Sequence, residues 1–198
     1  MSLFAILWVA AVAFGARVLF HYENEPGRVG MLARTWPATE IERATDRPTL
    51  VMLAHPHCPC TSASVGELAR IMAQLHGRIA AYVLFITPKE SGTDWESTTL
   101  RRSAEAIPGV KVVFDRDGVE ARRFGAETSG HTLLFGADGG LLFSGGITAS
   151  RGHEGENAGE NSIVALVNRQ TPARTQTLVF GCSLVNRPET GHGALCLK

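Results

Sequence analysis

The sequence has no excess of charge of either sign, because its 198 residues carry 19 basic and 19 acidic side chains. Proteins that read nucleic acid concentrate Lys and Arg against the phosphates, so this balance argues against such a partner. The sequence shows no internal repeat and no paired CxxC motifs of the kind that hold a zinc finger. The glycines of residues 144–157 lack the spacing of a phosphate-binding loop. What remains is one globular domain with an apolar extension, in a chain with 44% hydrophobic residues.

A long hydrophobic run stands at the N-terminus. Residues 3–20 are almost wholly apolar, interrupted by Gly15 and by Arg17 near the end of the run. As a helix this run rises roughly 27 Å, just short of the hydrocarbon thickness of a bilayer. We expect residues 1–23 to be a membrane anchor, with a cleaved signal peptide or a buried core helix as the alternatives. An anchor and a signal peptide both export the rest of the chain, which predicts a membrane-attached domain on the periplasmic or other extracytoplasmic side.

The remaining chain divides into a connector, a domain and an extension. Residues 24–48 are rich in Pro and Gly and predict a linker, with Trp36 docked on the domain. Residues 49–170 alternate between strand and helix patterns, which predicts an α/β domain with a mixed sheet covered on both faces. We expect strands at 49–54, 80–86, 110–114, 131–135 and 141–143, and helices at 65–75, 96–107, 120–124 and 162–167. Residues 171–198 form a C-terminal extension that contains two cysteines.

The most informative segment is His55-Pro56-His57-Cys58-Pro59-Cys60, where the first expected strand gives way to the first helix of the domain. Ser64 and Glu67 form a possible capping box for that helix. A thiol at a helix N-terminus meets unpaired N–H groups and the positive end of the dipole, which favour its thiolate. The thiolate attacks disulfides and binds soft metals, so we expect the chemistry here.

The order of elements, the cysteine pair that opens the first helix, and the late hairpin around Ala137-Asp138-Gly139-Gly140 resemble the thioredoxin fold. The stretch from Val110 to Gly146, with Phe114-Asp115-Arg116-Asp117-Gly118, resembles the redoxin branch of that fold and is similar to bacterial RedB-type proteins. The resemblance covers about residues 49–168 and implies exchange with protein thiols or disulfides, without a cofactor. It implies that Cys58 attacks and Cys60 resolves the mixed disulfide, while His57 and the helix dipole lower the pKa of Cys58.

Three departures from that pattern affect the expected chemistry. Cys58 and Cys60 are separated by one residue where the family has two, and a smaller, more strained ring makes the oxidised form a better oxidant. His131 stands where the family has a proline before the hairpin strand. It is a candidate base for the resolving thiol, or simply the first residue of a strand. The threonine of the peroxidase signature is replaced by His55, which argues against a peroxidase.

Two other functions stay open at this point. Copper or zinc suits a mixed set of imidazoles and thiols, which predicts a metallochaperone of the same fold as the main rival. Its candidate ligands are His55, His57, Cys58, Cys60 and His131. A non-catalytic docking module is the third possibility.

The cysteines of the extension and the polar loop have open roles as well. Cys182 and Cys196 are expected to form a structural disulfide worth on the order of 3 kcal/mol. The alternatives are a second redox pair that relays electrons to Cys58 and Cys60, and unbridged or metal-bound thiols. In the loop 144–157, Arg151 or His153 could contact a substrate, although a solvated loop explains the composition equally well.

Overall fold

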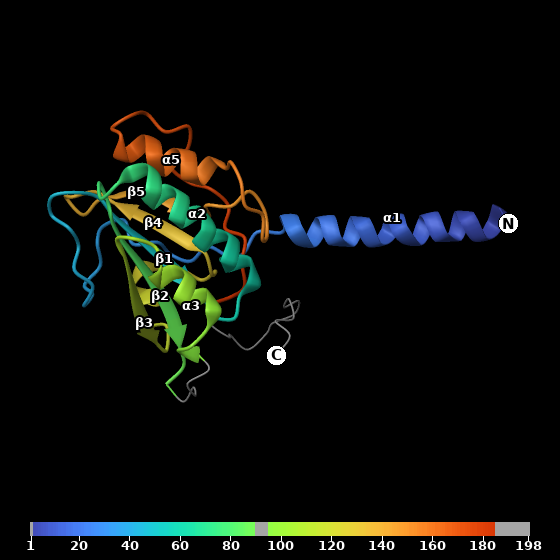
Figure 1. The fold of residues 1–198 in the computed structure, drawn as a ribbon, viewed down its shortest axis with the longest axis horizontal. Helices are drawn as coiled ribbons and strands as arrows, with labels where there is room; N and C mark the ends of the chain where they lie inside the picture. Colours follow the sequence, from blue (N-terminus) through green and yellow to red (C-terminus); the bar gives the residue numbers. More distant parts are fainter. Residues whose placement is uncertain (1, 90–94, 185–198) are drawn as a thin grey trace.

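The computed structural model describes residues 2–89 and 95–184 of the chain. Its core is a five-stranded sheet in the order β3-β2-β1-β4-β5 (Figure 1). The strands are β1 (Thr49–Ala54), β2 (Ala80–Thr87), β3 (Val110–Arg116), β4 (His131–Phe135) and β5 (Leu141–Gly145). The helices are α1 (Ser2–Asn24), α2 (Pro59–Leu75), α3 (Thr99–Glu105), α4 (Val119–Phe124) and α5 (Ala158–Val167). The predicted α/β class and mixed sheet are confirmed.

The sheet is parallel on one side of β1 and antiparallel on the other. β1 pairs in parallel with β2, and β2 with β3. β4 runs antiparallel to both β1 and β5. All six residues of β1 are buried, because both faces of this central strand are covered. The end of β1 therefore has a fixed position, and the cysteine segment follows it directly.

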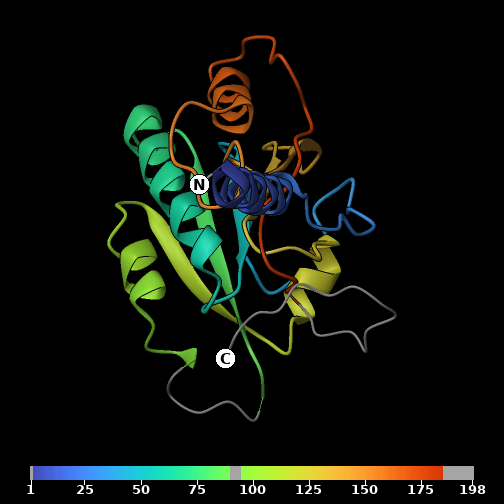
Figure 2. The ribbon, with the colours of Figure 1, turned by 90° about the vertical axis from the view of Figure 1, so that its right-hand side faces the viewer.

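Helices cover the two faces of the sheet unequally. On one face, Leu50 and Met52 of β1 pack in the same hydrophobic cluster as side chains of α2, α3 and α5. On the other face, Val51 and Leu53 pack in the cluster that contains Phe124 of α4. Figure 2 shows α2 and α3 on one side of the strands and α4 on the opposite side. The alternation of side chains along β1 produces this division.

The expected linker packs along the domain on the α4 side. The Trp36 ring packs edge-to-face on Phe124 and on Phe135, at centroid distances of 5.3 and 5.1 Å. Ile41 is buried in the same cluster. Trp36 therefore docks as the sequence predicts.

Helix α2 begins earlier than its apolar periodicity indicates. Its first residue is Pro59, with Cys58 at the N-cap, so Ser64 and Glu67 are not a capping box. Proline is well suited to the first helical position because its fixed φ matches the helix and no N–H is lost there. Glu67 instead lies fully buried in the middle of the helix. It pairs with Arg70 and accepts a hydrogen bond of 2.7 Å from the Gly155 N–H, which fixes the loop before α5.

Helices α3 and α5 also differ in length from the expected helices. Helix α3 is shorter, because the Thr98 hydroxyl caps it by accepting from the Arg101 N–H. Helix α5 starts at Ala158, four residues before the expected start, because Asn157 caps it by accepting from the Glu160 N–H at 2.8 Å.

Helix α1 projects away from the domain (Figure 1). Its segment Leu3–Asn24 is 22 residues long and apolar enough to cross a membrane, and none of its most apolar window is buried against the protein. Glu23, in its last turn, accepts a hydrogen bond of 3.0 Å from the Arg151 N–H. The apolar run is therefore not a core helix, while an anchor and a signal sequence both fit its exposed position.

Candidate functional site

The candidate site forms where β1 ends and α2 begins. The Cys58 N–H donates to the His55 carbonyl at 3.1 Å, which makes a tight turn between the two elements. Cys58 has extended backbone angles at the N-cap, and Pro59 follows at the first helical position. The sequence thus places the Cys58 side chain at the positive end of a 17-residue helix.

The Cys58 sulfur is buried and surrounded by donors. The side chain of Cys58 is 2% exposed. Hydrogen bonds from the Cys182 thiol, the Cys60 thiol, the Thr61 hydroxyl and the Cys182 backbone, in decreasing order of effect, hold the pKa of Cys58 far below its usual value. Burial acts in the opposite direction and is outweighed. Cys58 is therefore the thiolate of this site.

Cys60 is the protonated member of the pair. Its pKa is raised far above the usual value, first because its thiol donates to Cys58 and then because it is buried. The Arg151 guanidinium, which hydrogen bonds to Cys60, offsets a part of this shift. One negative charge is thus concentrated on Cys58, with Cys60 and Arg151 beside it.

The two histidines before Cys58 lie against an aromatic ring. His57 donates its backbone N–H to His55 Nδ1 at 3.2 Å. Both imidazoles meet Trp95 nearly edge-on, at centroid distances of 5.1 Å for His55 and 4.9 Å for His57. Burial lowers the pKa of His55, and the charge of Cys58 raises it in part. The electrostatic influence of Cys58 thus reaches His55, while the role expected for the exposed His57 stays a prediction.

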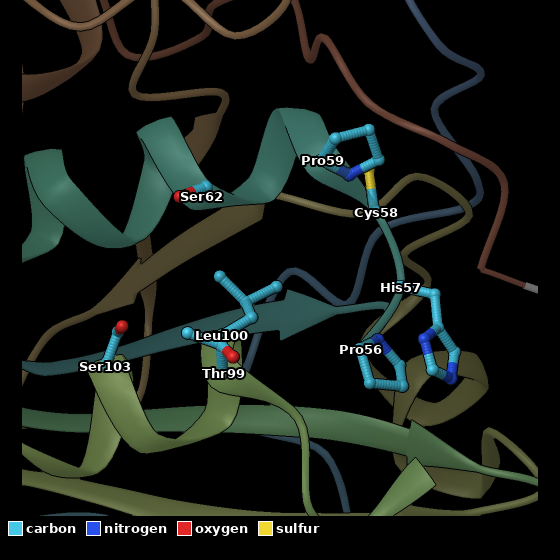
Figure 3. A pocket seen from close by; sticks show the side chains of 8 residues that line it. All are labelled: Pro56, His57, Cys58, Pro59, Ser62, Thr99, Leu100 and Ser103. Carbon is cyan, nitrogen blue, oxygen red and sulfur yellow. The ribbon is translucent and has the colours of Figure 1, made fainter. Parts of the chain in front are cut away.

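A shallow, open cleft of about 220 Å³ lies between the start of α2 and helix α3. Figure 3 shows Cys58 at the first turn of α2, with residues of α3 across from it. The lining residues are Pro56, His57, Cys58, Pro59, Ser62, Thr99, Leu100 and Ser103. The cleft borders the nucleophile but does not enclose it.

The loop before β4 connects the cysteine segment to the C-terminal extension. The Ser129 hydroxyl accepts from the His55 N–H at 2.7 Å and lies 2.6 Å from the Thr61 hydroxyl. The Ser129 N–H donates to the Cys182 carbonyl at 2.8 Å. Ser129, two residues before His131, is therefore the residue of this loop that contacts the site.

His131 lies in a different environment from the one expected of a base at the thiols. It pairs with Leu53 in the sheet and, with Leu133 two residues on, belongs to the face that α4 covers, opposite α2. Its Nε2 lies 2.8 Å from the Ser144 hydroxyl, and its Nδ1 has no hydrogen-bond partner among the described residues. Complete burial lowers its pKa to about 4, which keeps the ring neutral. A catalytic role for His131 stays a prediction that this geometry does not support.

The five metal-ligand candidates do not converge. Residues 2–89 and 95–184 contain no group of three or more His, Cys, Asp or Glu side chains arranged to hold a metal ion. His131 faces the opposite side of the sheet from α2, and the nitrogen of His55 nearest to His57 accepts that residue's backbone N–H. These donor positions provide no support for the copper alternative.

Comparison with solved structures places this architecture among known folds. An uncharacterised conserved protein from Geobacillus kaustophilus superimposes with a TM-score of 0.59 at 18% identity, over 85% of this chain and 97% of that one. A hypothetical protein from Sinorhizobium meliloti 1021 gives a TM-score of 0.59 at 16% identity, over 82% and 96%. A putative thiol:disulfide interchange protein DsbE from Chlorobium tepidum gives 0.49 at 13% identity, over 70% and 97%. The fold is thioredoxin-like. No family model and no curated protein matches the sequence.

Sequence reasoning identified the cysteines of this thioredoxin-like site but missed part of their surroundings. Trp95 and Ser129 gave no signal, because a single aromatic or serine in a loop has no distinctive pattern. Arg151 was named as a possible substrate contact, and the structure places it against Cys60. Cys182 was expected to pair with Cys196, which lies outside the described residues. That pairing stays a prediction, and within the described residues Cys182 hydrogen bonds to Cys58.

Proposed function

We propose that the chain is a membrane-tethered thiol–disulfide oxidoreductase that acts on protein thiols or disulfides through its Cys-Pro-Cys site. The observation that carries this proposal is the concentration of donors on one sulfur at a helix N-terminus. A thiolate attacks a disulfide only as fast as it is present and accessible, and these donors keep Cys58 ionised.

The shape of the site supports a protein substrate. The cleft beside Cys58 is small and open, whereas sites for small molecules enclose most of their ligand. Pro56 and Leu100 offer apolar surface next to the nucleophile, and Ser62 and Thr99 offer hydroxyls. A cysteine on an exposed segment of a partner protein fits such a cleft better than a buried cofactor does.

The exposed apolar helix supports attachment to the membrane and an extracytoplasmic location. Helix α1 has no core to pack against, so its apolar side chains require a bilayer or removal as a signal sequence. An amino-terminal anchor or signal sequence that exports the rest of the chain would put the site on the extracytoplasmic side, as proposed. Disulfide chemistry is favoured in such compartments.

The exchange reaction itself is the first test. The full chain in detergent micelles should accelerate the reduction, by dithiothreitol, of a fluorescent peptide that is joined by a disulfide to a quencher peptide. Fluorescence recovery measures the rate. Arg47→Ala is the control, because Arg47 precedes β1, at the opposite end of that strand from Cys58, and its exposed side chain lies outside the cleft. A wild-type rate equal to that of dithiothreitol alone would contradict the proposed activity.

Membrane attachment is tested by fractionation. The full chain should sediment with membranes and resist extraction at alkaline pH, because about 20 apolar residues are sufficient to span a bilayer. A chain that lacks residues 2–20 should be soluble and folded, since none of the hydrophobic cores includes that segment. An uncleaved full-length chain in the soluble fraction would show that α1 is not an anchor.

A further inference from the structure

The C-terminal extension returns to the site along the edge of the sheet. Ser144 of β5 donates its N–H to Thr175 at 3.0 Å and accepts from the Thr177 N–H at 3.2 Å. The buried side chains of Val179 and Phe180 follow. The extension then passes close to the start of α2, as the red trace beside Cys58 in Figure 3 shows. Its course is therefore fixed by backbone hydrogen bonds and burial before it reaches Cys182.

Residues 181–184 form a short antiparallel pairing with the loop before β4. The Ser129 N–H donates to Cys182, the Leu184 N–H donates to Glu127 at 2.9 Å, and Thr128 and Ser183 form a bridge. Because Ser129 also bonds to His55 and Thr61, one hydrogen-bonded unit holds the extension, the loop and the first turn of α2.

Gly181 lets the two backbones approach closely. A Cβ at this position would lie 2.0 Å from the Ser129 carbonyl oxygen, so any side chain would push the extension outward. The Arg151 guanidinium donates to the Gly181 carbonyl at 2.8 Å and also bonds to Cys60. These contacts place Cys182 at a defined position beside the cysteine pair.

The thiols themselves are in contact. Both the side chain and the backbone of Cys182 hydrogen bond to the Cys58 sulfur. No disulfide joins Cys58, Cys60 or Cys182 to another described residue. Cys58 thus has two possible disulfide partners, one separated from it by a single proline and one on a distant segment.

The two partners differ in how easily a bond to Cys58 can form. A bond from Cys58 to Cys60 would close over Pro59 alone, whose ring fixes one backbone dihedral, at the start of a regular helix. Cys182 stands on a segment outside the helix, so a bond from Cys182 to Cys58 would not close a ring over the first turn of α2. Cys182 is also half-buried, whereas Cys60 is buried.

We propose that Cys182 is the resolving cysteine of this site. The inference rests on the proposed exchange activity and replaces Cys60 in the role that the resemblance gave it. The Cys58 thiolate attacks the substrate disulfide, forms a mixed disulfide and releases the first substrate thiolate, which takes up a proton from solvent. The Cys182 sulfur then attacks Cys58, loses its proton to solvent and expels the second substrate thiolate, which takes up a proton. Two electrons pass to the substrate, which leaves as two thiols, and a dithiol reductant restores the Cys58–Cys182 disulfide to thiols.

The test uses the full chain with single substitutions at three cysteines. In single-turnover reactions with the disulfide peptide, Cys182→Ser should accumulate the Cys58 mixed disulfide and resolve it about tenfold or more slowly. Cys60→Ser removes a thiol donor to Cys58 and should change the rate of the first attack, but it should not accumulate the mixed disulfide. Cys196→Ser is the matched control in the same extension and should behave as wild type. Mass spectrometry of unreduced peptides after oxidation with diamide should show Cys58 joined to Cys182.

Each other outcome overturns the assignment in a distinguishable way. A Cys58–Cys60 bond, with trapping only in Cys60→Ser, would make Cys60 the resolving residue and leave the proposed function intact. A Cys182–Cys196 disulfide in the active protein would show that Cys182 belongs to a structural disulfide and does not resolve the mixed disulfide. If the wild-type chain exchanges nothing, the proposed function fails, and the mapped bond still decides whether Cys58 pairs with Cys182. A purely structural role would change the melting temperature without trapping a mixed disulfide.

Discussion

Cys58→Ser should reduce the rate of disulfide exchange by at least about a thousandfold, the order of loss seen when an enzyme loses its nucleophile. A serine hydroxyl stays protonated in this site, and oxygen does not take part in thiol–disulfide exchange. The fluorescent peptide assay in micelles measures the loss, with Arg47→Ala, outside the cleft, as the control variant. Substantial activity in Cys58→Ser would mean that another cysteine attacks the substrate.

The same residue should have an unusual pH profile. Because donors from Cys182 and Cys60 hold the pKa of Cys58 far below its usual value, its alkylation rate should be almost constant between about pH 5 and about pH 8. The alkylation rate of a thiol with an ordinary pKa would fall roughly tenfold for each unit by which the pH is lowered over the same range. Iodoacetamide labelling followed by mass spectrometry measures this site by site. A tenfold loss per unit at Cys58 would contradict the donor arrangement.

His131 should make the folded state sensitive to acid. Its pKa is lowered from 6.5 to about 4 by burial, so the unfolded chain binds a proton between these values while the folded chain does not. The free energy of unfolding therefore rises with pH in this window, and the contribution is lost as pH falls from 6.5 to about 4. From pH 7 to about pH 3.5 the loss is roughly 3 kcal/mol, a little over a hundredfold in the folding equilibrium.

His131→Gln isolates this effect. The glutamine amide can keep a hydrogen bond to Ser144 Oγ but does not titrate. Asp115 and Glu160 have pKa values raised by burial, so their contribution has the opposite sign and is the same in both proteins. Urea unfolding at several pH values should show the extra decrease in the free energy of unfolding at acid pH in the wild type alone. Parallel curves for the two proteins would show that folding does not lower the pKa of His131.

The alternation of elements was predictable because the central strands β1 and β2 are continuous apolar runs. β1 and β2 are buried on both faces, so nearly every residue is hydrophobic and the pattern is unambiguous. The apolar repeat began only at Val65, because the first turn of α2 carries Cys60 and polar residues instead, whereas the expected position of the cysteine pair at the start of this helix is confirmed. Pro59 was the available signal, since proline favours the first helical position.

The position of His131 shows the limit of matching a family by pattern. Side chains alternate between the two faces of a strand, so a shift of one residue against the family's proline changes which side of the sheet a residue faces. Ser129 and not His131 contacts the cysteine segment. The role of Cys182 was beyond sequence reasoning for another reason: spacing along the chain does not tell where an extension returns to the domain.

Arg151 has a further consequence through its contact with the last turn of α1. Its guanidinium lies over the Tyr22 ring, 5.1 Å from the centroid, and the same side chain bonds to Cys60. Tyrosine rings at the ends of membrane helices lie at the level of the lipid headgroups. With α1 inserted as proposed, the cysteines lie close to the bilayer surface, because Arg151 connects Cys60 to the last turn of α1. The protein then meets membrane-bound partners by diffusion in the plane of the bilayer. This favours substrate disulfides that lie close to the lipid surface over disulfides that lie far above it.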